Sequence, residues 1–206
     1  RHEKAYAFCD VLVIGGGPAG LMAALTAARA GAEVIVAEES SEPGGRLLSD
    51  SQQVGGRPAA DWLGDMLATL AATGRVRVMT RTTVTGAYDD GSYGALERVA
   101  RHLPPADDLP PECFWRIRAK QSVLAAGAHE RPIAFPMNDR PGIMLAGAVR
   151  TYLNRYGVAP GRSVTIFAAN DDAHRTALEL RGAGVDVAAV IDSRTGVSAQ
   201  GDYRLI

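Results

Sequence analysis

The chain has 206 residues, 47% of them hydrophobic, which is enough for one or two domains with a substantial apolar core. Its 22 basic and 23 acidic side chains nearly balance, so no electrostatic argument favours binding to nucleic acid or to an anionic membrane. No apolar run reaches the length of a membrane-spanning helix, and no signal-peptide pattern is present.

The two cysteines are isolated from each other in the sequence. Cys9 and Cys113 lack C-x-x-C spacing, which favours buried, reduced thiols in a cytoplasmic protein over a disulfide framework. Because the chain starts at Arg1 without a methionine and stops at Ile206 shortly after a predicted strand, we expect both ends to lie within a longer protein.

After a polar lead-in over Arg1–Phe8, expected on the surface, the chain shows a strand–turn–helix–strand pattern. Residues 10–14 read as a short buried strand, residues 21–30 as a helix of small residues, and residues 33–37 as a second strand. This order is typical of a βαβ unit with a parallel sheet.

The turn between the first strand and the helix carries the clearest motif of the chain. Gly15, Gly17 and Gly20 fit G-x-G-x-x-G, and Glu38 lies 18 positions after the last glycine. Gly15 allows a tight turn, Gly17 lets backbone approach a pyrophosphate, and Gly20 lets helix and strand pack closely. The helix N-terminus would bind the phosphates, and Glu38 would accept hydrogen bonds from a ribose. The motif predicts a dinucleotide site, although a glycine turn that only packs a βαβ unit is the alternative.

A loop of turn-forming residues follows the second strand. Gly44 and Gly45 can bring backbone close to a ligand, and Arg46 can reach a phosphate or the adenosine edge. A solvated loop arginine is the alternative for Arg46.

The middle of the chain changes from helical to strand periodicity. Residues 58–73 predict an amphipathic helix and residues 75–79 a third strand. Between about 81 and 120 we expect a small antiparallel β-meander, with a stiff proline-rich connection over residues 103–111. Val84 would lie near an adenine in such a fold, and core packing is an equal contender.

The last third of the chain predicts a second strand–turn–helix–strand unit. Another buried strand is expected over residues 121–127 and a helix within residues 141–156. The second unit is then predicted by strands at 163–167 and 185–191 around a helix at 173–181. Its turn, residues 168–172, has no glycine and carries Asp171 and Asp172, which would repel a pyrophosphate.

These elements together predict an α/β fold. We expect a Rossmann-like parallel sheet with an inserted meander as the first domain, residues 1–158, and an incomplete, degenerate second Rossmann-like unit at residues 159–206. One dinucleotide should therefore bind per chain.

Several longer motifs resemble one family. The chain resembles flavoproteins with two dinucleotide-binding domains, and more narrowly the alpha subunit of heterotetrameric sarcosine oxidase, as an N-terminal-half fragment. The resemblance rests on Gly15–Gly20, Gly56–Trp62, Tyr93–Arg98, Leu124–Pro132, Asn138–Gly142 and Val149–Asn154.

The resemblance implies the role of a nucleotide-holding part in a larger enzyme. That enzyme is a cytoplasmic complex with beta, gamma and delta subunits that demethylates sarcosine oxidatively to glycine. It passes the one-carbon unit to tetrahydrofolate and electrons to oxygen, using FAD and FMN. The resemblance implies that the NAD of the alpha subunit contacts Ala19, Glu38, Glu39, Ser40, Arg46 and Val84. The predicted cofactor site also includes Gly15, Gly17, Pro18, Gly20, Gly45, Ala126 and Gly127. FAD is the alternative occupant of this site, because both dinucleotides use the same fingerprint.

We assign no catalytic and no metal-ligating residue, because no nucleophile–base arrangement stands out. The alternative function is a free-standing FAD-dependent NAD(P)H oxidoreductase without a redox disulfide. The degenerate second fingerprint counts against it, because hydride transfer between two bound cofactors would lack a second site.

Overall fold

The computed structural model of the chain describes residues 2–104 and 109–206, and part of the proline-rich connection predicted over residues 103–111 lies outside them. The chain divides into two compact units, one formed by residues 1–47 and 54–127 and the other by residues 48–53 and 128–206. The domain boundary that the sequence predicts after residue 158 stays a prediction.

The first unit is built on a six-stranded sheet with the strand order β5-β2-β1-β8-β7-β6. Its strands are β1 (His2–Ile14), β2 (Val34–Ala37), β5 (Val76–Met79), β6 (Thr82–Tyr88), β7 (Ser92–Glu97) and β8 (Glu112–Leu124). β5, β2, β1 and β8 run parallel, whereas β6, β7 and β8 pair antiparallel. The predicted parallel sheet with its antiparallel meander is therefore confirmed.

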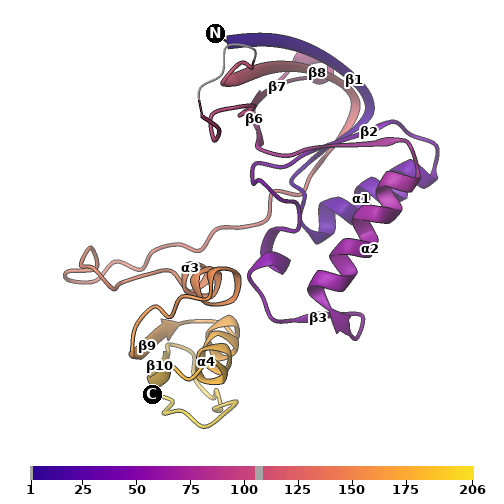
Figure 1. Ribbon diagram of the computed structural model, residues 1–206. Coiled ribbons are helices and arrows are strands. Elements are labelled where there is room, and N and C mark those ends of the chain that lie inside the picture. The colour runs from indigo at the N-terminus through magenta and orange to yellow at the C-terminus, as the bar shows by residue number, and fades with distance from the viewer. Residues whose placement is uncertain (1, 105–108) are drawn as a thin grey trace. The chain divides into compact units, whose positions relative to one another are not determined.

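Two helices cover one face of the parallel strands (Figure 1). They are α1 (Pro18–Arg29) and α2 (Ala59–Ala72), and they pack against each other. α2 buries Leu63, Met66 and Leu70, while Asp61 and Asp65 on the opposite side are exposed, as its sequence pattern predicts. The short elements η1 (Gly45–Leu48), β3 (Gln53–Val54), β4 (Arg57–Pro58) and η2 (Asp89–Gly91) fill the connections.

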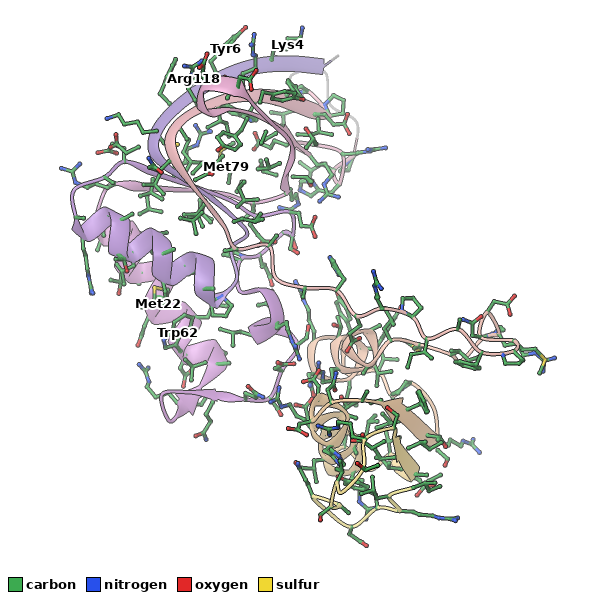
Figure 2. The ribbon with its side chains drawn as sticks, turned by 180° about the vertical axis from the view of Figure 1, so that it is seen from behind. Lys4, Tyr6, Met22, Trp62, Met79 and Arg118 are labelled. Atoms are coloured by element: carbon green, nitrogen blue, oxygen red, sulfur yellow. The ribbon has the colours of Figure 1, made fainter. Side chains whose placement is uncertain are left out.

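The predicted surface lead-in over Arg1–Phe8 is wrong, because residues 2–8 belong to β1, which pairs with β8 along its whole length. Its side chains alternate between the two faces of the sheet: Ala7 and Cys9 are buried, whereas Tyr6 and Phe8 are 64% and 78% exposed. Figure 2 shows Tyr6 on the outer side of this sheet and Met79 within the unit. Both cysteines are free and buried, as predicted, and burial raises the pKa of Cys9 to about 11.

The separate buried strand predicted over residues 121–127 is also wrong. β8 continues without a break from Glu112 to Leu124, since no turn-forming residue separates its two halves. Its last residues are exposed, Leu124 at 78%.

The second unit contains a parallel strand pair and a helix in the predicted order. β9 (Ser163–Ala168) and β10 (Asp186–Asp192) pair in parallel, and α4 (Asp172–Gly182) connects them. Ile166, Leu180 and Val190 are among the buried residues of its core. This agrees with the predicted incomplete second Rossmann-like unit.

The helix predicted within residues 141–156 begins later than its apolar spacing suggested. It comprises α3 (Ala146–Arg150) and the π-helical turn η3 (Thr151–Arg155). Gly142 has a φ of 94°, which is incompatible with a right-handed helix so soon after Pro141. In the described part of the chain, no helix is long and apolar enough to span a membrane.

Candidate dinucleotide site

The glycine-rich turn lies at the carboxyl end of β1, where α1 begins. Gly15 has a φ of 105°, and a Cβ placed on it would lie 2.3 Å from the carbonyl oxygen of Ala125, just after β8. A Cβ on Gly20 would lie 1.9 Å from the carbonyl oxygen of Gly15. Both glycines are therefore required by the packing of strand, turn and helix.

Gly17 is different, because protein packing does not require it to be a glycine. It is the N-cap of α1 with φ −72° and ψ 179°, a conformation open to most residues. The nearest atom to a Cβ at this position would be the Cα of Gly45 at 3.9 Å. A side chain here would therefore point into space that a close-lying ligand could use.

The start of α1 is suited to an anion. Gly17 makes no side-chain capping hydrogen bond, Pro18 occupies the first helical position, and the first turn has no acidic residue. The N–H groups of Ala19 and Gly20 lie in this first turn, where α-helical N–H groups have no partner within the helix. Together with the helix dipole, they favour a phosphate group.

Glu38 follows β2 and lies against the turn. Its residue is only 6% exposed, its Oε2 accepts the N–H of Gly16 at 2.7 Å, and its Oε1 accepts the N–H of Ser40 at 2.7 Å. A Cβ on Gly16 would lie 2.9 Å from Oε2, so the middle glycine of the triplet leaves room for this carboxylate. Each carboxylate oxygen retains acceptor capacity for a ribose hydroxyl.

A second glycine loop covers the first. The N–H of Gly44 donates to the carbonyl oxygen of Gly16 at 2.8 Å. Gly45 has a φ of 53°, and a Cβ on it would lie 3.0 Å from the Cα of Gly17. Arg46 follows within η1 with an exposed side chain. The loop thus brings Gly45 directly to the open position beside Gly17.

The other predicted site residues lie in different surroundings. Glu39 is exposed, and Ser40 is half-buried, with its carbonyl oxygen accepting the N–H of Arg81. Val84 is half-buried and packs against the core cluster around Leu12, which supports its structural role. None of these positions distinguishes NAD from FAD.

Beyond β8, Ala126 and Gly127 differ in how close they lie to the turn. A Cβ placed on Gly15 would lie 3.1 Å from the Cα of Ala126, so Ala126 borders the turn. Gly127 is exposed with a φ of 71°, and a Cβ there would meet nothing within 4 Å.

Two residues of the arrangement were missed from the sequence: Gly16, whose N–H donates to Glu38, and Ala125, which supports Gly15. Gly44, which the sequence did indicate, donates its N–H to Gly16. The run of three consecutive glycines was a usable signal for Gly16. Ala125 had none, since its contact depends on the pairing of β1 with β8.

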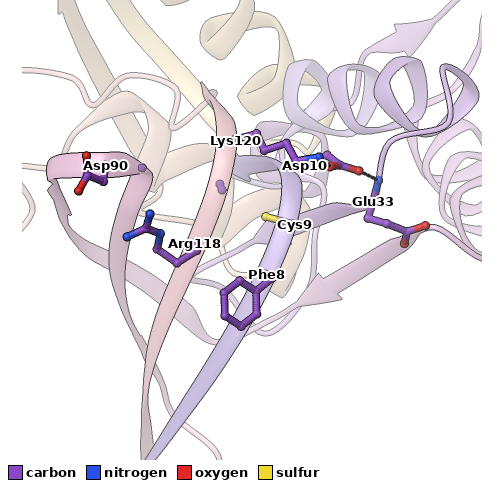
Figure 3. A pocket seen from close by; sticks show the side chains of 9 residues that line it. Phe8, Cys9, Asp10, Glu33, Asp90, Arg118 and Lys120 are labelled. Atoms are coloured by element: carbon purple, nitrogen blue, oxygen red, sulfur yellow. Dashed lines mark hydrogen bonds and ion pairs between the residues drawn. The ribbon is translucent and has the colours of Figure 1, made fainter.

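A depression of about 520 Å³ lies elsewhere on the first unit (Figure 3). It is lined by Phe8, Cys9, Asp10, Glu33, Asp90, Gly91, Arg118, Ala119 and Lys120. Within it, Asp10 accepts the N–H of Glu33 at 2.8 Å and pairs with the Lys120 ammonium at 2.7 Å. The hydrogen bonds from Lys120 and Glu33 lower the pKa of Asp10. These contacts join β8, β1 and the start of β2, and none of the lining residues is a predicted dinucleotide contact.

Comparisons with known proteins agree with this fold and place the chain in a family. The family model described as FAD dependent oxidoreductase matches residues 10–90. In the search of solved structures, L-proline dehydrogenase from P. horikoshii matches with a TM-score of 0.73 and 25% identity over 97% of this chain and 38% of that one. The fold is therefore that of a flavin-binding oxidoreductase domain.

The sequence relatives are more specific. The sarcosine oxidase subunit alpha of Rhizobium meliloti (strain 1021) is 54% identical over 208 residues, covering 100% of this chain and 21% of the relative. The sarcosine oxidase subunit alpha of Corynebacterium sp. (strain P-1) is 47% identical over 96% of this chain and 21% of its own length. By homology over its whole length, the chain thus belongs with the alpha subunits of sarcosine oxidase, and it spans about a fifth of the length of the curated relatives it matches.

Proposed function

We propose that the chain is the NAD-holding part of a sarcosine oxidase alpha subunit. The observation that carries the proposal is that a Cβ at Gly17 would have no neighbour closer than 3.9 Å, combined with the Glu38 carboxylate bound to the adjacent Gly16. Packing explains Gly15 and Gly20, whereas Gly17 is explained by a ligand that approaches the backbone.

In this proposal the N–H groups at the start of α1 bind the pyrophosphate, and Glu38 orients the adenosine ribose. Arg46 lies in the loop that follows Gly45 and would add a positive charge to the phosphate side. NAD supplies hydride-transfer chemistry when it serves as a redox cofactor. Here we propose that it is a structural ligand, because we assign no catalytic residue to the chain.

FAD is the second candidate for the same site, since the matching family model describes FAD-dependent oxidoreductases. The two ligands differ in colour and mass. We therefore propose to purify the chain, record its visible absorbance and identify the released ligand by mass spectrometry. NAD without flavin absorbance supports the first candidate, and FAD with a flavin spectrum supports the second. A chain that retains neither ligand and binds neither when they are added would contradict both.

The start of α4 in the second unit supports the proposal that the chain binds only one dinucleotide. Asp172 lies in the first turn of α4 and is held by two hydrogen bonds from Arg150, at 3.0 and 2.7 Å. Asp171, the N-cap, pairs with Arg194 at 2.8 Å. Carboxylates therefore occupy the helix end at which a phosphate would bind.

At the level of the whole enzyme, we propose oxidative demethylation of sarcosine to glycine in a cytoplasmic heterotetramer. The one-carbon unit would pass to tetrahydrofolate and electrons to oxygen, with FAD and FMN in the complex and beta, gamma and delta subunits as partners. The naming of the relatives as alpha subunits supports a multi-subunit enzyme.

A further inference from the structure

Within the first unit, most of β1 has a neighbouring strand on only one edge. β1 pairs with β8 over residues 2–14, whereas its pairing with β2 is confined to residues 11–14. Among the residues that the structure describes, no strand pairs with the other edge of β1 over residues 2–9. An edge of this kind presents a row of backbone N–H and C=O groups that another strand can bind.

The outer face of the sheet combines aromatic rings and cations along this edge. In the register of β1 and β8, Tyr6 lies opposite Arg116 and Phe8 lies opposite Arg118. Tyr6 and Phe8 are 64% and 78% exposed, and Lys4 and the two arginines are exposed as well. Figure 2 shows Lys4 and Tyr6 pointing away from the sheet, and Figure 3 shows Phe8 and Arg118 on adjacent strands.

Carboxylates of the unit do not neutralise these cations. Among the described residues, Lys4 and Arg116 form no ion pair, and the guanidinium of Arg118 donates to the hydroxyl of Ser92 at 3.2 Å. The carboxylate of Asp10, at the end of the open edge, is already paired with Lys120 at 2.7 Å. Charge complementarity therefore favours an acidic partner for this face.

The inner face of the same stretch is apolar and made of small residues. Ala7 and Cys9 belong to the buried core cluster, and Ala5 is half-buried. Apolar side chains of an added strand would lie beside these residues and extend the core cluster, because neighbouring strands are only about 5 Å apart. A strand with acidic residues on one side and apolar residues on the other therefore fits both faces of the edge.

We infer that residues 2–9 are a docking site for an extended, acidic segment of another polypeptide chain, which adds to the sheet as a strand beside β1. Its acidic side chains would lie next to Lys4, with Arg116 and Arg118 one strand farther away, at about 10 Å. Cations and aromatic rings would also suit a nucleic acid, but only a polypeptide strand uses the backbone groups of the open edge. The inference is independent of dinucleotide binding.

The test measures the binding of fluorescent octapeptides to the full chain by anisotropy at low ionic strength. A peptide of alternating glutamate and valine is long enough to cover residues 2–9, and we expect it to bind saturably. N-methylation of its four central residues keeps every charge and side chain but removes the backbone donors, so it should abolish binding. Hydrogen exchange should then locate the unmethylated peptide, by slowing the amides of residues 2–9 about tenfold.

Charge reversal on the protein tests the choice of an acidic partner. Lys4→Glu should raise the dissociation constant of the unmethylated peptide about tenfold, because two carboxylates would then face each other. Arg29→Glu reverses the charge of an exposed arginine in the last turn of α1 in the same unit, and it should leave the constant unchanged.

Equal binding of the methylated and unmethylated peptides would overturn strand addition, and so would the absence of binding or protection of amides elsewhere in the chain. Tighter binding of an oligothymidylate of the same length would assign the face to single-stranded nucleic acid. A dimer of the unmodified chain in light scattering that Lys4→Glu dissociates would assign the edge to a second copy. Both of these results would contradict the inference.

Discussion

At Gly17 a Cβ would meet only ordinary van der Waals contact, at 3.9 Å, so a substitution there should affect ligand binding without affecting folding. We expect Gly17→Ala to keep the melting temperature of the chain within a few degrees of the original, because its Cβ would have no neighbour closer than 3.9 Å. Gly15→Ala is the matched contrast, since its Cβ would lie 2.3 Å from Ala125 at a φ of 105°. It should lower the free energy of unfolding by at least about 2 kcal/mol. Equal melting temperatures for the two variants would contradict the packing described for the turn.

Glu38 should determine which nicotinamide dinucleotide binds. A 2′-phosphate would face its carboxylate, so NAD should stabilise the chain against heat and NADP should not. Glu38→Gln should reduce the preference for NAD about tenfold. The variant should also lose about 1–3 kcal/mol of stability, because one backbone N–H would face an amide N–H. Glu33→Gln, at an exposed glutamate of the same unit, is the control. Equal thermal shifts with NAD and NADP for the original chain would refute the assignment.

At the scale of elements, β1 can be tested by two neighbouring substitutions. Ala7 belongs to the buried core cluster, whereas the next residue, Phe8, is 78% exposed. Ala7→Asp should therefore cost about 3 kcal/mol or more in unfolding free energy, since it buries an unpaired charge. Phe8→Asp should cost far less in a denaturant titration. Similarly small losses of unfolding free energy in both variants would support a surface location for residues 2–8, as the sequence suggested.

Local patterns predicted most of the elements of this chain, and long-range pairing explains where they failed. The strand–turn–helix–strand order around Gly15 and the stripe of α2 follow from short-range periodicity, and both were correct. Residues 2–8 looked polar because the segment opens with His2, Glu3 and Lys4, and only the pairing with β8 defines the strand. In the site, the spacing of 18 residues from Gly20 predicted that Glu38 would lie at the turn, whereas its hydrogen bond from the N–H of Gly16 was not predicted. The support from Ala125 depends on the sheet order and could not be predicted locally.

At the scale of the whole molecule, the chain contains an intact dinucleotide fingerprint and no assigned catalytic residue. We therefore expect it not to oxidise sarcosine on its own, because amine oxidation needs a flavin placed against the substrate. Peroxide production from sarcosine should be absent with added FAD and NAD. It should appear when the chain is part of a complete alpha subunit with its partners. Turnover by the chain and FAD alone would contradict this expectation.

The central claim is that one dinucleotide binds at the turn formed by Gly15–Gly20, and calorimetric titration tests it most directly. NAD titrated into the unmodified chain should bind with a stoichiometry of one, and Gly17→Val should abolish binding while the protein remains folded. At a concentration of a hundred times its dissociation constant, the ligand should add about 2.7 kcal/mol of stability, or roughly 5–10 °C in melting temperature. A stoichiometry of two, or tight binding that persists in Gly17→Val, would contradict the account.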